Sequence, residues 1–239
     1  MDEVQVLPGI KATQDYALYL EAEQALVISD LHLGYEGALR KQGVSLPRFQ
    51  KKHMIERLAH LLDRYDPEKL VIAGDFKHEF SRNLREEWTE VTDVLNFLQD
   101  KVEPVLVRGN HDNFLMTILY RKGLELHEPA YDLGRFVVTH GHLEVEAPTG
   151  LIMGHEHPAL RLKDTIGATL NLPCFTVRED LIILPAFSPL AHGSDVLRGP
   201  YLSPMVSRKA VLGSQIYGLD EKLGILEFGP AKELIHARS

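Results

Sequence analysis

The sequence predicts an α/β fold of one domain with two packed sheets. Up to about residue 165, short apolar runs alternate with amphipathic stretches, which is typical of βαβ units and of a partly parallel sheet. After that point short apolar runs follow one another, which indicates a more antiparallel, β-rich half. No linker, low-complexity tract or internal repeat interrupts the chain, so we expect a single domain over residues 1–239.

The first half of the chain contains five predicted strands and two predicted helices. The helices cover residues 50–65 and 83–101, where apolar side chains recur at helical spacing on one face and charged side chains occupy the other. The strands are the apolar runs at residues 25–29, 70–73, 105–107, 136–138 and 151–153.

The second half contains shorter predicted elements. Strands are expected at residues 168–172, 174–177 and 181–184, with Pro173 and the polar residues 178–180 between them. Residues 216–219 and 223–228 flank a polar turn and are predicted to form a hairpin. The tail, residues 231–239, is expected to be a short helix or a frayed end.

Composition limits the classes of function. The 239 residues carry a formal net charge of −8, which disfavours a protein held on nucleic acid or acidic lipid by overall charge, although a local basic patch stays open. Cys174 is the single cysteine, which excludes an intramolecular disulfide and a cysteine-rich zinc site. The first residues do not resemble a signal peptide, and the sequence has no apolar run of about 20 residues. We therefore expect a soluble, cytoplasmic protein without a membrane partner.

Each of the five strands in the first half ends in side chains that bind metals or transfer protons. One such cluster would be an ordinary turn, because Gly, Asn and Asp favour turns. Five clusters at the carboxyl ends of strands indicate a site, because ligands of open α/β sheets bind beyond those ends. The residues that follow the five strands are Asp30 and His32, Asp75, Asn110 to Asp112, His140 and His142, and His155 and His157.

Seven of these side chains form a plausible set of metal ligands. Carboxylates, imidazoles and an amide oxygen suit Mn, Fe, Zn, Ni or Co better than calcium or copper(I). Seven ligands are too many for one tetrahedral ion but suit two ions that share a bridging carboxylate, and such a pair can bind and activate a phosphoryl group. His111 would then stay off the metals as a general acid or transition-state donor. The seven predicted ligands are Asp30, His32, Asp75, Asn110, His140, His155 and His157.

The same residues resemble the calcineurin-like metallophosphoesterase superfamily. Its pattern is D-x-H, G-D, G-N-H-D/E, H and G-H-x-H, and all five motifs occur here in that order within residues 25–158. The resemblance implies a four-layer α/β/β/α sandwich with two packed mixed sheets. It also implies a hydrolase of phosphate esters that uses two divalent ions, with a metal-bridging hydroxide as the nucleophile.

The resemblance further implies a role for each matching position. His111 would contact the scissile phosphate and act as general acid, and Asp112 would orient its imidazole. Asp75 would bridge the two metal ions. Asp30, His32 and His157 would bind the first ion, and Asn110, His140 and His155 the second.

The stretches at residues 29–34 and 74–78, together with Gly43 and Pro47, resemble a subgroup related to DNA ligase-associated phosphoesterases. This resemblance favours a phosphodiesterase over a monoesterase and a nucleotide or nucleic acid as substrate. Manganese is the expected ion. The alternatives are a DNA-repair nuclease that works with a DNA-processing partner, and a non-catalytic metal-binding interaction module.

Some roles stay open at the level of sequence. Lys77 and His78 could contact substrate or belong to a solvated loop. His142 could support the metal ligands or cap a turn, and His192 could approach the site or lie in a plain connection. An exposed sheet edge, or the apolar run at residues 197–206, could support a homodimer.

Overall fold

The computed structural model describes residues 1–79, 85–163, 169–191 and 193–236, and two sheets dominate it. The first sheet contains seven strands in the order β1 (Glu3–Leu7), β2 (Ile10–Thr13), β3 (Leu18–Leu20), β4 (Ala25–Ile28), β5 (Lys69–Ala73), β6 (Glu103–Val107) and β7 (Leu126–His127). Strands β1 to β4 pair antiparallel and β4 to β7 pair parallel, so this sheet is mixed.

The second sheet is also mixed. Its path is β14 (Ser194–Asp195), β11 (Pro158–Lys163), β12 (Thr169–Arg178), β13 (Leu181–Ile183), β10 (Leu151–Met153), β9 (Phe136–Thr139) and β8 (Ala130–Leu133). Off this path, β15 (Gln215–Asp220) pairs with β12 and with β16 (Gly224–Pro230). Strands β9, β10 and β13 are parallel neighbours, whereas β12 is antiparallel to β13.

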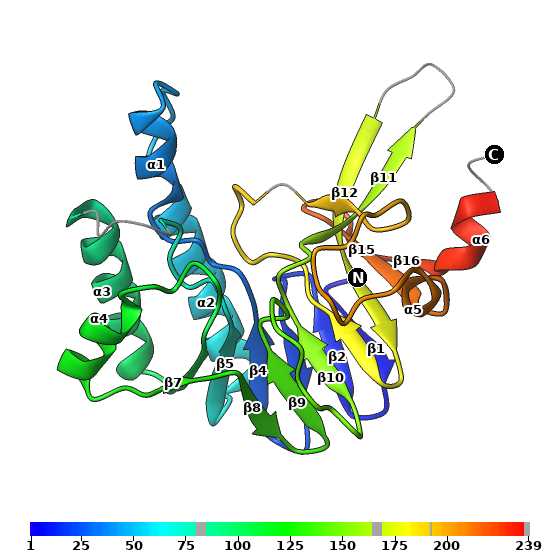
Figure 1. The fold of residues 1–239 in the computed structure, drawn as a ribbon, viewed down its shortest axis with the longest axis horizontal. Coiled ribbons are helices and arrows are strands. Elements are labelled where there is room, and N and C mark those ends of the chain that lie inside the picture. Colours follow the sequence, from blue (N-terminus) through cyan, green and yellow to red (C-terminus); the bar gives the residue numbers. More distant parts are fainter. Residues whose placement is uncertain (80–84, 164–168, 192, 237–239) are drawn as a thin grey trace.

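Six helices cover the outer faces of the two sheets. They are α1 (Tyr35–Lys41), α2 (Gln50–Tyr65), α3 (Arg85–Gln99), α4 (Leu115–Lys122), α5 (Arg208–Leu212) and α6 (Ala231–His236), counted over the described residues. Figure 1 shows α1 to α4 together on one side of the molecule and α5 and α6 on the other.

Three apolar clusters account for the layers. One lies between the sheets and joins residues such as Val27 and Val71 to Val138 and Phe175. A second packs the helical side of the first sheet against α2, α3 and α4, and a third packs the second sheet against α5 and α6. Each buried strand therefore presents side chains to a core on both faces. The predicted α/β/β/α sandwich is confirmed.

The amphipathic stretches fold into helices as predicted. In α2 the buried side chains recur at helical spacing, as in Met54, Leu58 and Leu61, and the helix ends at Asp66 in the left-handed region (φ 42°) just before a proline. The second predicted helix is α3; the first two positions of its predicted range lie outside the described residues. None of the helices in the described part of the chain is long and apolar enough to cross a membrane.

The structure corrects two expectations. Residues 169–178 form one strand through Pro173, where two separate strands are predicted. Pro173 lies where the ladder with β11 ends and the ladder with β15 begins, so its missing N–H interrupts neither ladder. The antiparallel strands β1 to β3 have no counterpart in the prediction, because strands of three to five residues give only a weak pattern.

Part of the run considered for a dimer contact is used within the chain. Leu197 and Val206 are buried in the third cluster, whereas Leu202 is exposed. Leu197 and Val206 therefore pack within the chain, in the cluster between the second sheet and helices α5 and α6, and are not available to a second copy.

Candidate metal centre

The seven predicted ligands meet where strands from both sheets end. Asp30, Asp75 and Asn110 follow the parallel neighbours β4, β5 and β6 of the first sheet. His140 and His155 follow β9 and β10 of the second sheet, which are also parallel neighbours. The site therefore spans the two sheets.

The backbone at this site is unusual. Five of the seven predicted ligands have positive φ although they are not glycine: Asp30 (54°), His32 (48°), Asp75 (41°), His155 (68°) and His157 (42°). Such conformations are strained and persist where the surrounding structure enforces them, commonly at functional sites. The backbone here is held so that side chains from separate strands converge.

One group of donor atoms contains Asp30, His32 and His157. His157 Nε2 lies 3.3 Å from Asp30 Oδ1 and 3.4 Å from His32 Nε2. The structure thus brings together the three residues that the resemblance assigns to the first ion.

A second group contains Asp30, Asp75 and His140. His140 Nε2 lies 3.1 Å from Asp30 Oδ1 and 3.4 Å from Asp75 Oδ2. Asp75 Oδ2 also lies 3.8 Å from His32 Nε2, so its carboxylate is near members of both groups, which share Asp30. This position suits the bridging role predicted for Asp75, which stays a prediction.

The remaining two predicted ligands lie beside these groups. The His155 ring is 4.6 Å from the His140 ring, centroid to centroid, and its backbone N–H donates to Asp30 Oδ2 at 3.0 Å. Asn110 Oδ1 is buried and accepts no hydrogen bond from any described residue. A buried amide oxygen of this kind is costly unless a donor or cation completes it.

The protonation of the site suits cations. Burial lowers the pKa of His32 to about 3 and that of His155 to about 4, so both rings are neutral and offer lone pairs. Burial opposes ionisation of Asp30, but the charge of His157 and hydrogen bonds from His140 and His157 hold its pKa well below the ordinary value. Burial also opposes protonation of His140, yet Asp30 and Asp75 raise its pKa to about 10. Two buried carboxylates thus demand nearby positive charge.

Two buried polar atoms of the predicted ligands lack hydrogen-bond partners among the described residues. His32 Nδ1 and Asn110 Oδ1 form no hydrogen bond within the described part of the chain. The neutral imidazoles, the ionised carboxylates and the amide oxygen of Asn110 form a mixed N/O donor set of the kind that binds Mn, Fe, Zn, Ni or Co. The residues present therefore fit two divalent cations.

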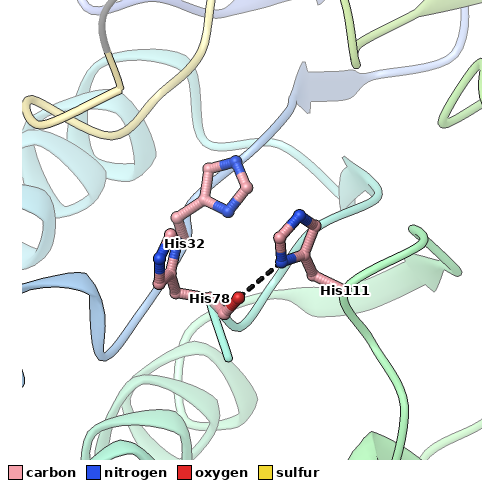
Figure 2. A group of neighbouring side chains, drawn as sticks. All are labelled: His32, His78 and His111. Carbon is pink, nitrogen blue, oxygen red and sulfur yellow. Dashed lines mark hydrogen bonds between the residues drawn. The ribbon is translucent and has the colours of Figure 1, made fainter. Parts of the chain in front are cut away.

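His111 lies at the edge of this site. Its Nδ1 bonds with the backbone carbonyl of His78, and its Nε2 lies 3.9 Å from Asp75 Oδ2 (Figure 2). Its backbone N–H donates to Asp75 Oδ1 at 2.9 Å. The ring is partly exposed, at 29%, so it can meet a substrate.

Both carboxylate oxygens of Asp112 accept from backbone amides, and its predicted role in orienting His111 stays a prediction. Its Oδ1 accepts from the backbone N–H of Lys77 at 3.2 Å, and its Oδ2 accepts from that of Gly109 at 2.8 Å. Burial, followed by the charge of Asp75, raises the pKa of Asp112 to about 6. The carboxylate fixes the loops after β5 and β6, which carry His78 and His111, and the carbonyl of His78 bonds with the His111 ring.

His78 is a member of the site that the sequence left undecided. Its ring stacks on Tyr35 at 3.8 Å between centroids, and its donor atoms group with those of His32 and His111. Figure 2 shows these three imidazoles close together. The sequence signal was the position of His78 three residues after Asp75; nothing in the sequence indicated the stacking of Tyr35.

Lys77 is buried, and its charge is used within the protein. Its Nζ lies 3.7 Å from Glu87 Oε2 and donates to the backbone carbonyl of Glu79, and both side chains of the ion pair are almost fully buried. Of the other undecided residues, His142 lies with its Nδ1 3.0 Å from His140 Nδ1, where it can fix the ring of a predicted ligand. His192 lies outside the described residues.

We expect Lys77→Met to destabilise the protein by about 3 kcal/mol, because it leaves the buried carboxylate of Glu87 without its cation. Urea unfolding of the variant and of wild type measures the difference. Lys52→Met is the matched control, because the ion pair of Lys52 with Glu56 is exposed, and we expect a change of about 0.5 kcal/mol or less. Equal effects of the two substitutions would contradict the structural role of Lys77.

We expect Gly74→Ala to distort the metal centre. An added Cβ would lie 2.3 Å from His140 Cδ2, at a backbone φ of +84°. Gly43→Ala is the matched control, because Gly43 has φ +87° but open space around the added Cβ. The first variant should be about 1–3 kcal/mol less stable than the second in urea unfolding and should bind less metal. Equal stability and metal content in the two variants would contradict this close packing.

Comparisons with known proteins give a family match and similar solved structures. The family described as Calcineurin-like phosphoesterase matches residues 24–202. Nuclease MPE of Pseudomonas putida is 24% identical, with a TM-score of 0.67 over 90% of this chain and 95% of that chain. Yfce, a phosphoesterase from E. coli, is 20% identical, with a TM-score of 0.40 over 82% of this chain and 88% of the other. No curated protein matches the chain. The likeness to nuclease MPE shows a shared fold.

Proposed function

The chain belongs to the calcineurin-like phosphoesterase family, and we propose that it is a dinuclear metal-dependent phosphodiesterase acting on nucleotides or nucleic acid. The observation that carries this proposal is a pair of donor groups that share Asp30, one of them including Asp75, with His111 beside them. Two bound divalent ions would supply activated water and would neutralise the charge that develops on the phosphoryl group. Manganese is the proposed ion.

The proposed roles follow from the positions of the side chains. Asp30, His32 and His157 would hold one ion, and His140, His155 and Asn110 would hold the second. The carboxylate of Asp75, 3.4 Å from His140 and 3.8 Å from His32, would be shared by the two. These residues come from both sheets, so the fold itself would position the two ions.

His111 is proposed to protonate the leaving group from Nε2. A carbonyl oxygen only accepts, so the bond with His78 requires a proton on Nδ1 of His111. The transferable proton of the doubly protonated ring is therefore the one on Nε2, the atom that faces the site. Asp112 supports this arrangement indirectly, by fixing the two loops that carry His78 and His111.

The substrate class is proposed from two features. The resemblance at residues 29–34 and 74–78 points to the subgroup of DNA ligase-associated phosphoesterases, and nuclease MPE, which shares the fold, is a nuclease by its printed name. A DNA-repair nuclease with a DNA-processing partner is the second candidate on the same grounds. The net charge of −8 means that bound cations and local positive charge must attract an anionic substrate. The third alternative, a non-catalytic metal-binding interaction module, gains no support, because His111, the proposed general acid, is present beside the predicted ligands.

Hydrolysis of a chromogenic phosphodiester, measured beside the matching monoester, tests this proposal. The protein is stripped with a chelator, and manganese is then restored. We expect activity that depends on the metal and is greater on the diester. Asp30→Asn should abolish it, whereas His60→Ala, which alters an exposed histidine of α2 paired with Asp15, should not. Greater activity on the monoester would redirect the search to small phosphorylated metabolites. Absence of activity on both, with metal bound, would contradict the enzyme proposal for these substrates.

A further inference from the structure

A cavity of about 450 Å³ opens beside His157, one of the predicted metal ligands. Its walls come from α2, from β12, from residues 186–191 with Gly193, and from the turn between β15 and β16, and neither His78 nor His111 lines it. We propose that this cavity binds the nucleoside next to the scissile phosphate. The inference rests on the proposed function and assigns it a substrate subsite.

Backbone hydrogen bonds join the cavity wall to the segments that carry the predicted metal ligands Asp30 and His157. The backbone N–H of Ser188, a lining residue, donates to the carbonyl of Asp30 at 3.1 Å. Phe187 N donates to Ser29 O at 2.8 Å, and Ser194 N donates to His157 O at 3.0 Å. An occupant of the cavity is therefore held at a fixed position relative to two predicted ligands of the first ion, as a substrate group next to the reacting phosphate requires.

Arg57 provides a positioned donor on this wall. Its guanidinium carbon lies 4.1 Å from the centroid of the Tyr16 ring and 5.1 Å from that of Phe187, and its Nη1 donates to the carbonyl of Phe187 at 2.9 Å. Within the described part of the chain, Arg57 forms no ion pair. Since a guanidinium has five N–H donors in a fixed plane, this residue can offer further donors to a ligand.

The charges of the wall favour a neutral polar group over a second phosphate. Arg57 and Lys222 face Asp220 and Glu221 around the same cavity, so the wall carries no surplus of positive charge, which a phosphate site needs. The other walls combine apolar surface, as at Leu172 and Pro173, with an exposed amide at Asn171.

A nucleobase has this chemistry, with two apolar faces and an edge of hydrogen-bond donors and acceptors. Arg57 would donate to acceptors on that edge, while Asn171 can both donate and accept. The volume lies within the range of about 300–1,000 Å³ that is typical of small-molecule sites, so a base and its sugar can enter.

Kinetics with two substrates that share a leaving group test the subsite. Methyl p-nitrophenyl phosphate and thymidine 5′-(p-nitrophenyl phosphate) differ only in the group that the cavity would hold. We expect Arg57→Ala to lower the ratio of kcat/KM for the thymidine ester to that for the methyl ester by about tenfold or more. Arg57→Lys should restore part of this ratio.

Two further variants separate loss of the subsite from a general loss of folding. Asn171→Trp places bulk at an exposed position of β12 on the cavity rim and should lower the same ratio. Arg135→Ala removes another arginine that lies over an aromatic ring, 4.5 Å from the Phe136 centroid, at the opposite end of β9 from His140, and should leave the ratio unchanged. An unchanged ratio in both cavity variants would overturn the proposal.

Binding separates this inference from the proposed function. Thymidine 5′-monophosphate and ribose 5-phosphate are titrated into the full-length protein with and without manganese, and binding is followed calorimetrically. Tighter binding of the nucleotide, lost in Asn171→Trp, would support the subsite even if no ester is hydrolysed. Equal affinity for the two ligands, in a protein that hydrolyses both esters, would leave the phosphodiesterase intact and refute the subsite.

Discussion

Replacing Asp75 with asparagine is expected to reduce phosphodiester hydrolysis by about a hundredfold or more and to lower the metal content of the purified protein. Loss of a residue that only orients a metal ligand commonly costs about 10–100-fold in affinity or activity, and a shared direct ligand should cost more. The expectation rests on the position of the Asp75 carboxylate, which lies near His32, His140 and His111 at once. Elemental analysis and steady-state kinetics on the same preparations measure both effects.

Asp63→Asn is the control for this substitution. Asp63 is an exposed carboxylate on α2, so the variant has the same change of charge without a change at the site. We expect its metal content and activity to equal those of wild type. A normal metal content in the Asp75 variant would contradict the bridging role of this residue.

Replacing His111 with alanine is expected to lower hydrolysis of a dinucleotide by about 10²–10⁴-fold while leaving the metal content unchanged. The effect should depend on the leaving group. An alkoxide must be protonated as it departs, whereas p-nitrophenolate is stable without a proton, so the loss should be smaller for a p-nitrophenyl diester. Kinetics on the two substrates with the same protein preparation test this dependence.

The pattern of loss distinguishes proton donation from other roles of His111. An equal loss on both substrates would indicate that His111 stabilises charge on the phosphoryl group or positions the substrate. Loss of metal in the variant would instead place His111 among the ligands, together with His32 and His78, with which its donor atoms are grouped.

The positions of the predicted ligands followed from the sequence because two independent patterns coincide there. Val105 to Val107 must be buried on both faces of a parallel sheet, and the chain must then turn at Gly109 into Asn110 and His111. Parallel neighbours end at the same edge of a sheet, so strand ends that are far apart in sequence meet in space. The structure brings Asp30, His140 and His157 together in this way.

The contacts around those ligands did not follow from the sequence. Asp112 caps the backbone amides of Lys77 and Gly109, a choice of partner that depends on how two loops approach each other. The stacking of Tyr35 on His78 likewise depends on the packing of α1 beside the loop after β5. Lys77 has the charge expected of a phosphate ligand, and only its burial beside Glu87 shows a structural role.

The apolar pattern also left part of the fold undetermined. Strands β1 to β3 have only three to five residues each, so their apolar pattern is too short to separate them from loops. Pro173 normally marks the end of a strand, but here the change of ladder partners accommodates it within β12. Both features depend on pairing between distant segments.

Anomalous diffraction from crystals grown with manganese tests the central claim most directly. The account predicts two anomalous peaks per chain, one beside Asp30, His32 and His157 and the other beside His140, His155 and Asn110, with the Asp75 carboxylate between them. A single peak, or two peaks that Asp75 does not join, would contradict a dinuclear centre.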